Sequence, residues 1–122
     1  MIEQLKQFDL VYLASPYGKY PKGRERAFTK ICRIAGKLIE AGVNVYSPIA
    51  HLHPIATYGH IERGNDFWLK FDEAIMSKSS AIAVAMMDSW ETSTGIEYEL
   101  NFFNKAEKLI FFLNPEDFGE RP

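Results

Sequence analysis

The stretch Leu10-Val-Tyr-Leu-Ala-Ser15 (LVYLAS) decides the fold, because it is a short apolar run of strand-forming residues that ends at Pro16. Three further runs of the same kind follow it along the chain, at residues 43–46, 81–87 and 109–113. Apolar runs without polar alternation are typical of strands that are covered on both faces. The four runs therefore predict a mainly parallel sheet between two layers of helices.

Between these runs, apolar residues recur at helical spacing. The first helical segment is followed by Gly42, at the position where a left-handed C-terminal cap favours glycine. Two more helices are predicted over residues 66–78 and 95–106, whereas residues 49–65 are predicted as a loop with room for a helical turn. We expect one α/β domain over residues 1–122, with a doubly wound, mainly parallel sheet of about four to five strands, flavodoxin-like or Rossmann-like.

The composition argues against several classes of protein. A chain of 122 residues with 47% hydrophobic and 25% charged residues fits one ordinary globular domain. Its formal net charge of -2 implies no broad positive field for a nucleic acid polymer or a membrane surface. No signal peptide is visible, and no apolar stretch approaches the ~18 residues of a membrane helix. The single cysteine, Cys32, excludes an internal disulfide and fits a reducing compartment, so we expect a cytoplasmic protein.

Ligands of open parallel sheets bind at the carboxyl ends of the strands. The segments that leave those ends are residues 15–26, 48–65 and 88–95. In the first of them, the candidate substrate-binding residues are Ser15, Tyr17, Arg24 and Arg26. Tyr17 directly follows the strand and is the best candidate for stacking on a ligand or contacting a sugar. Arg24 and Arg26 could reach a phosphate, or they could be solvated charges at a helix start.

Two carboxylates lie at positions where apolar residues are expected. Asp72 has apolar residues one turn before and one turn after it on its helix, and Glu99 is bracketed in the same way on the next helix. Either residue alone could be a boundary or salt-bridged carboxylate. Because burying a charge costs several kcal/mol, the two together indicate a pair in a partly apolar pocket. Such a pair suits glycosyl transfer, which needs one nucleophile and one acid or base.

The loop Asp88-Ser-Trp-Glu-Thr-Ser-Thr-Gly95 leads into the helix that carries Glu99. Thr94 and Glu97 have the spacing of a capping box, which predicts that this helix starts at Gly95. Ser93, Thr94 and Gly95 would then offer free N–H groups and hydroxyls that suit a phosphate. Asp88 is a further candidate for substrate binding, and plain N-capping without a ligand explains the loop equally well.

The three histidines, His51, His53 and His60, lie close together in the sequence. Their spacing lacks a third ligand at a recognised interval, so we expect substrate contacts or surface histidines rather than a metal site.

Several of these motifs, in this order along the chain, resemble nucleoside 2-deoxyribosyltransferases and the related 2'-deoxynucleoside 5'-monophosphate N-hydrolases. Val11-Tyr-Leu-Ala-Ser-Pro-Tyr17 looks like the opening "YLAGP" of that superfamily, and Ser93-Thr-Gly-Ile-Glu-Tyr-Glu-Leu100 is similar to its helix start. The resemblance implies that Glu99 is the nucleophile and that Asp72 assists the departing base or orients the sugar. It also implies a small-molecule substrate, a homodimer or larger oligomer, and no metal or other cofactor.

Within the superfamily, the residue six positions before the nucleophile separates two branches. Base-exchanging enzymes tend to have aspartate there, whereas the 5'-monophosphate hydrolases have a serine that holds the phosphate. Ser93 occupies this position, so the resemblance favours a nucleotide hydrolase. The hydrolases' glycine-rich stretch after the first strand is replaced here by residues 17–26. A deoxyribosyltransferase and a non-catalytic nucleotide-binding module are the alternatives.

Overall fold

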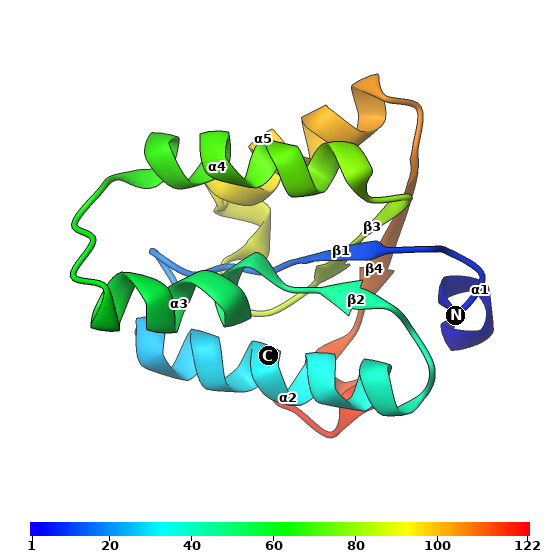
Figure 1. The fold of residues 1–122 in the computed structure, drawn as a ribbon. Coiled ribbons are helices and arrows are strands. Elements are labelled where there is room, and N and C mark those ends of the chain that lie inside the picture. The colour runs from blue at the N-terminus through cyan, green and yellow to red at the C-terminus, as the bar shows by residue number, and fades with distance from the viewer.

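The protein is described here by a computed structural model that covers residues 1–122. Four parallel strands form one sheet in the order β2-β1-β3-β4 (Figure 1). The strands are β1 (Val11–Ala14), β2 (Val45–Tyr46), β3 (Ala81–Ala85) and β4 (Leu109–Leu113). The helices are α1 (Ile2–Leu5), α2 (Arg24–Glu40), α3 (Pro48–Tyr58), α4 (Asn65–Lys78) and α5 (Thr94–Lys105), with 3-10 turns η1 (Trp90–Thr92) and η2 (Pro115–Phe118). The fold is a single-domain Rossmann-like α/β fold.

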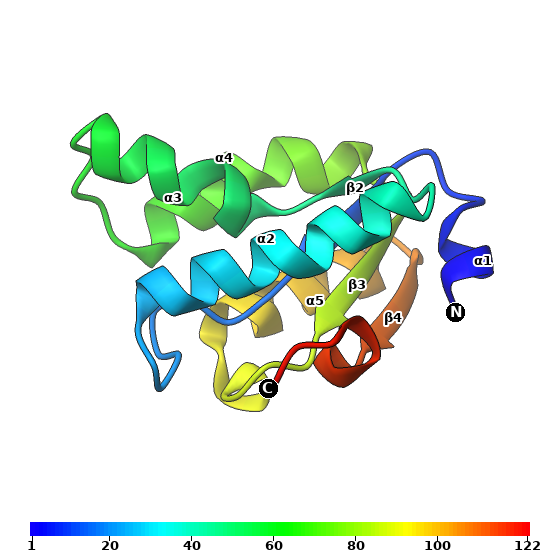
Figure 2. The same cartoon turned by 90° about the horizontal axis from the view of Figure 1, so that it is seen from below.

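The central strand β1 divides the core between the two faces of the sheet. Val11 and Leu13 point to the face covered by α2, whereas Tyr12 and Ala14 point to the face covered by α4 and α5. This alternation follows from the two-residue repeat of a strand. In Figure 1, α4 and α5 lie above the sheet and α2 below it. Figure 2 shows α2 crossing the lower face, with η2 beside it.

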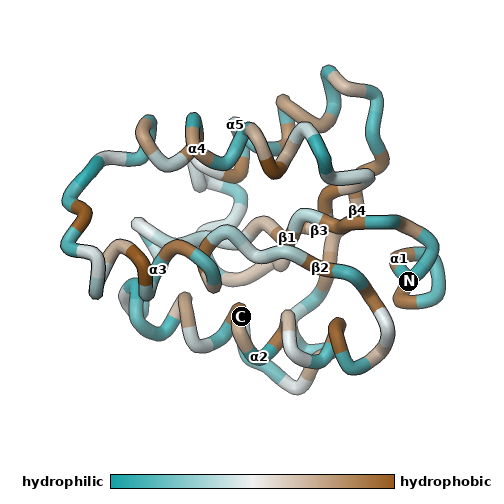
Figure 3. The backbone as a smooth tube through the Cα atoms, in the orientation of Figure 1, coloured by the Kyte–Doolittle hydropathy of each residue, from teal (hydrophilic) through white to brown (hydrophobic).

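The distribution of hydropathy along the chain matches these layers. The strands β3 and β4 are strongly hydrophobic, and the helices alternate between hydrophobic and hydrophilic positions (Figure 3). All five residues of β3 are fully buried, as expected for a strand that is paired on both sides and covered on both faces. None of the helices combines the length and the apolar character needed to cross a membrane.

The predicted strands and two of the predicted helices are confirmed, with ends that differ by one or two residues. Gly42 follows the end of α2 with φ of +96°, which confirms the predicted left-handed cap. The capping prediction for α5 was wrong by one residue. Ser93, not Thr94, is the N-cap, and its hydroxyl accepts the Ile96 N–H at 3.2 Å.

The prediction of a loop over residues 49–65 was wrong, because Pro48–Tyr58 forms the helix α3. Ser47 caps this helix by accepting the Ala50 N–H at 3.0 Å, and Pro48 occupies the first turn, where a proline costs no hydrogen bond. Pro54 lies inside the helix, although proline disfavours interior helical positions. The helix packs beside α2 and β1, which compensates for the hydrogen bond that Pro54 lacks.

Candidate functional site

A cavity of about 700 Å³ opens at the carboxyl ends of β1 and β3, where the order of the strands reverses. Its walls come from the loop after β1, from α3 and α4 with the segment between them, and from the first turns of α5. In Figure 1 these elements gather at the left, opposite the N-terminal helix α1. Eight of the predicted site residues line the cavity: Ser15, Tyr17, Arg24, Asp72, Ser93, Thr94, Gly95 and Glu99.

Glu99 is buried, with 6% of its surface exposed, although it lines the cavity. The Tyr12 hydroxyl, from the adjacent strand β1, donates a 2.5 Å hydrogen bond to Glu99 Oε2. Burial raises the pKa of Glu99 to about 8, since the charged form loses its hydration, and the nearby Asp72 acts in the same direction. The Tyr12 hydroxyl opposes this rise by stabilising the carboxylate. Tyr12 therefore fixes one oxygen and leaves the other free for a ligand.

Asp72 projects from α4 into the same region and is 4% exposed. Its Oδ1 is buried without a hydrogen-bond partner, and burial raises its pKa to about 7. Tyr46, at the end of β2, also has a buried hydroxyl without a partner, and burial together with Asp72 raises the pKa of Tyr46 to about 12. Unpartnered buried polar atoms are rare in folded proteins. Between about pH 7 and pH 8 the two carboxyls together therefore carry one proton, held mainly by Glu99, whose pKa is the higher.

The first turn of α5 forms another wall of the cavity. Ser93, Thr94 and Gly95 all line it. Ser93 Oγ already accepts the Ile96 N–H, so toward a ligand its hydroxyl can act as a donor. The N–H groups of Thr94 and Gly95 lie in the first turn, where no helical carbonyl is available to accept them. This wall therefore presents donors and the positive end of the helix dipole.

Three exposed basic side chains line the cavity, together with the exposed acidic Glu62. Arg24 lines it as predicted, and Lys19 and Arg63 line it too, although the sequence reasoning missed both. Arg26 and Asp88 were also predicted to bind substrate, but neither lines the cavity. Arg26 is exposed and lies two residues after Arg24 on α2. Residues two apart on a helix do not share a face, so its side chain points away from the side that faces the cavity. Asp88 is exposed in the loop after β3, and its N–H is bonded to the Pro122 carbonyl.

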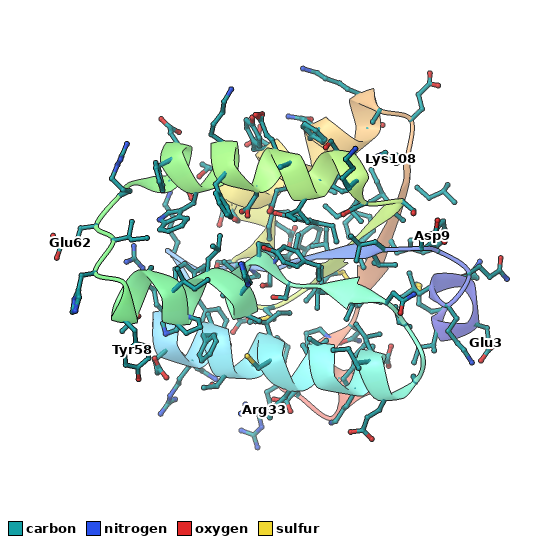
Figure 4. The ribbon with its side chains drawn as sticks, in the orientation of Figure 1. Glu3, Asp9, Arg33, Tyr58, Glu62 and Lys108 are labelled. Carbon is teal, nitrogen blue, oxygen red and sulfur yellow. The ribbon has the colours of Figure 1, made fainter.

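The α3 and α4 side of the cavity is mostly apolar. Its lining includes Ile49, Leu52, Ala56, Ile61, Trp68 and Leu69. His53 lies in this wall with most of its side chain buried, and it contacts both Tyr17 and Glu25 through its ring nitrogens. Tyr58, at the end of α3, points away from the sheet (Figure 4). A flat hydrophobic ring would fit this side, while the donors lie across the cavity on α5.

The histidines do not form a metal site. No group of three or more His, Cys, Asp and Glu side chains is arranged to hold an ion. His51 and His60 are exposed outside the cavity, and His53 alone lines it.

Together, the strand order and the cavity define a Rossmann-like protein with a cavity at the topological switch point, where ligands of open parallel sheets bind. A family model described as a domain of unknown function (DUF1937) matches residues 9–114, and the chain belongs to this family. The matched region includes every predicted site residue. A comparison with curated proteins gives no match.

Proposed function

We infer that this protein is an N-glycosidase that cleaves the bond between base and sugar in a nucleotide 5'-monophosphate. The observation that carries this proposal is the pair of buried carboxyls, Glu99 and Asp72, with raised pKa values in one cavity. A binding site alone does not need two buried acids, which cost free energy to desolvate. The resemblance to nucleoside 2-deoxyribosyltransferases and N-hydrolases supports the same chemistry.

The reaction has two steps, and it uses the one-proton form of the pair in which Asp72 holds the proton, the less populated of the two arrangements because Glu99 has the higher pKa. The Glu99 carboxylate attacks the anomeric carbon of the sugar and forms an ester bond. The C–N bond breaks, its electron pair moves to the base nitrogen, and the Asp72 carboxyl supplies the proton that the base needs. Water then adds to the anomeric carbon and releases Glu99, while Asp72 takes up the proton of that water. Release by a second base would make the enzyme a deoxyribosyltransferase.

The proposal that the substrate is a 5'-monophosphate rests on the hydrogen-bond donors at the start of α5 and on the basic side chains that line the cavity. The Thr94 and Gly95 N–H groups and the Ser93 hydroxyl are all donors, and an anion at a helix N-terminus also gains from the dipole. Lys19, Arg24 and Arg63 add positive charge around the same opening. A 5'-phosphate would therefore form several charge-assisted hydrogen bonds in this region.

Base release from matched substrates tests the function and the phosphate assignment together. We expect a 2'-deoxynucleoside 5'-monophosphate to be cleaved at least about tenfold faster, in kcat/KM, than its free nucleoside, because one charged hydrogen bond contributes ~1.5–3 kcal/mol. Ser93→Asp should reverse this order, since aspartate repels the phosphate and accepts a bond from a free 5'-hydroxyl. Aspartate is also a good N-cap, so the helix should persist.

Asn101→Asp provides the matched control, because it adds the same charge to α5 at an exposed position outside the cavity. This variant should keep the wild-type order of substrates. Equal kcat/KM for the wild-type pair would mean that the Ser93 turn is only a helix cap. No base release from any nucleoside or monophosphate, with ligand binding retained, would favour the non-catalytic binding module.

A further inference from the structure

A chain of three polar side chains borders the cavity on the α3 side and takes no part in the proposed reaction. Tyr17 Oη and His53 Nδ1 are 2.5 Å apart, and His53 Nε2 is 2.9 Å from Glu25 Oε2. Tyr17 and His53 line the cavity, whereas the Glu25 side chain is outside it and largely exposed, in the first turn of α2. The three residues connect the ligand cavity to the surface by two hydrogen bonds.

The His53 ring is held firmly between its neighbours. The Phe28 ring stacks on it with centroids 4.3 Å apart, and the Tyr17 ring meets it edge-on at 5.6 Å. Only 13% of the His53 side chain is exposed. Because the ring is packed on these sides and bonded at both nitrogens, its orientation is fixed, and the placement of the Tyr17 hydroxyl is fixed with it.

The direction of both hydrogen bonds follows from the available protons. An ionised carboxylate only accepts, so Nε2 of His53 carries the proton that faces Glu25. In a neutral imidazole the other nitrogen, Nδ1, is then an acceptor, and the Tyr17 hydroxyl must donate to it. Burial raises the pKa of Tyr17, so the phenol keeps this proton. The remaining lone pair of the phenol oxygen can only accept a hydrogen bond from a ligand.

We propose that the Tyr17–His53–Glu25 chain selects the base of the substrate, favouring nucleobases that carry an exocyclic amino group over those with a carbonyl oxygen at the same position. The inference rests on the proposed function. An amino N–H would donate to the Tyr17 oxygen, whereas a carbonyl would place lone pairs against lone pairs. The apolar side chains next to this chain offer a surface for the flat ring: Leu52, Ala56, Ile61, Trp68 and Leu69. A site built for one hydrogen-bonding group strongly rejects an analogue that cannot match it.

Equilibrium binding to the Glu99→Gln variant tests the inference without turnover. The ligands are two matched pairs, the 5'-monophosphates of deoxyadenosine and deoxyinosine and those of deoxycytidine and deoxyuridine, all measured at one fixed pH. The amino member of at least one pair should bind at least about tenfold more tightly. Adding Tyr17→Phe should abolish the preference. Adding His53→Phe should also reduce it toward unity, because the Tyr17 hydroxyl is then free to donate.

Glu25→Gln provides a milder variant at an exposed position, where folding is not at risk. A glutamine amide can donate to Nε2, which allows the proton to move to Nδ1 and weakens the preference. Tyr58→Phe and His51→Phe are the matched controls, since both side chains lie on α3 outside the cavity, and both should keep the wild-type preference.

Two results would overturn the inference. Equal affinities within both pairs, or a preference unchanged by His53→Phe, would show that the chain does not select the base. If the wild-type enzyme nevertheless releases bases, the proposed function stands and only the base selection is wrong. If none of the four nucleotides binds and no base is released, both proposals fail.

Discussion

The buried carboxyl of Glu99 makes the stability of the protein depend on pH. Its folded-state pKa of about 8 lies above the ordinary value of 4.5, so the folded state binds a proton that the unfolded state has lost. This contribution to the free energy of unfolding is fully present below about pH 4.5 and is lost as the pH rises through about 8. Glutamine stays neutral at every pH. We therefore expect the melting temperature of Glu99→Gln to exceed that of the wild type by a difference that increases between about pH 5 and pH 9.

Thermal melting of the two proteins across this pH range measures the effect. Glu97→Gln is the control, because Glu97 lies exposed on the same helix, and its melting should follow the wild type. A difference in melting temperature between Glu99→Gln and the wild type that does not change with pH would contradict the burial of a neutral Glu99.

The same residue should be essential for turnover. We expect Glu99→Gln to lower kcat by orders of magnitude while the fold is retained, because an amide cannot form the glycosyl ester. Glu97→Gln should keep wild-type rates. A Glu99→Gln enzyme that keeps more than about a tenth of the rate, a loss of under ~1.4 kcal/mol of barrier lowering, would rule out Glu99 as the nucleophile.

Asp72 should shape the pH profile of the reaction. The one-proton form of the Asp72–Glu99 pair supplies both the nucleophile and the acid. A plot of kcat/KM against pH should therefore be bell-shaped, with its maximum near the two raised pKa values, about 7 and about 8. Asp72→Asn should lower the maximum rate and move the acid limb to lower pH, since the Asp72 charge helps to raise the pKa of Glu99. Asp66→Asn, at an exposed position on the same helix, should leave the profile unchanged. An unaltered profile in Asp72→Asn would contradict the coupling.

At the level of elements, α2 and the turn that follows it contain two glycines with opposite expected effects on stability. Gly42 has φ of +96°, and an added Cβ would lie 3.2 Å from Lys6 Cε, so Gly42→Ala should destabilise the fold by about 1 kcal/mol. Gly36 is inside the helix, with open space around an added Cβ. Gly36→Ala should stabilise the fold by up to ~1 kcal/mol, because alanine is the better helix former. Urea unfolding measures both, and a shift of the same sign in the two variants would contradict the argument.

The strands and their flanking helices could be predicted from the sequence because each carries its own signal. The apolar runs and helical spacings are local, and Gly42 marks the end of α2 by its own conformational freedom. Helix α3 gave a weaker signal, because Pro54 interrupts it and its apolar residues do not form a clear stripe. The sequence Ser47-Pro48 is an N-cap followed by a first-turn proline, and this start signal could have revealed the helix.

The carboxyl pair was also predictable, since Asp72 and Glu99 each interrupt an apolar stripe on a helix. The partners of these residues were not predictable, because they depend on which strands are adjacent. Tyr12 contacts Glu99 across 87 positions of sequence, and a buried tyrosine in a strand indicates only that its hydroxyl needs some partner. The contacts of His53 required α3, which had been predicted as a loop. Lys19 and Arg63 could not be predicted, because no sequence pattern distinguishes a basic residue that lines a cavity from one on the open surface.

For the molecule as a whole, assembly into a homodimer or larger oligomer stays a prediction. Phe103 is fully buried in the core and cannot contribute to a surface between copies. Other large apolar side chains are exposed on the outer surfaces of α4 and β4, namely Phe71 at 50%, Phe112 at 41% and Leu109 at 60%. Such exposure is typical of surfaces that pair with another copy.

Sedimentation at micromolar concentration should show a species heavier than the 14.0 kDa chain. Phe71→Lys should shift it toward the monomer, whereas Tyr58→Lys, at the exposed end of α3 in Figure 4, should not. A single 14.0 kDa species for the wild type would contradict the prediction.

The position of Trp68 gives the cavity an intrinsic optical reporter. The chain has two tryptophans, and Trp68 lines the cavity, whereas Trp90 does not line it and packs against Phe112. A nucleobase that enters between α3 and α4 would displace water from the Trp68 indole or stack on it, and either change alters the emission of that ring. In a Trp90→Phe background the remaining tryptophan fluorescence comes from Trp68 alone. Ligands can therefore be screened by titration without label or turnover, and compounds that bind but do not react are detected along with substrates.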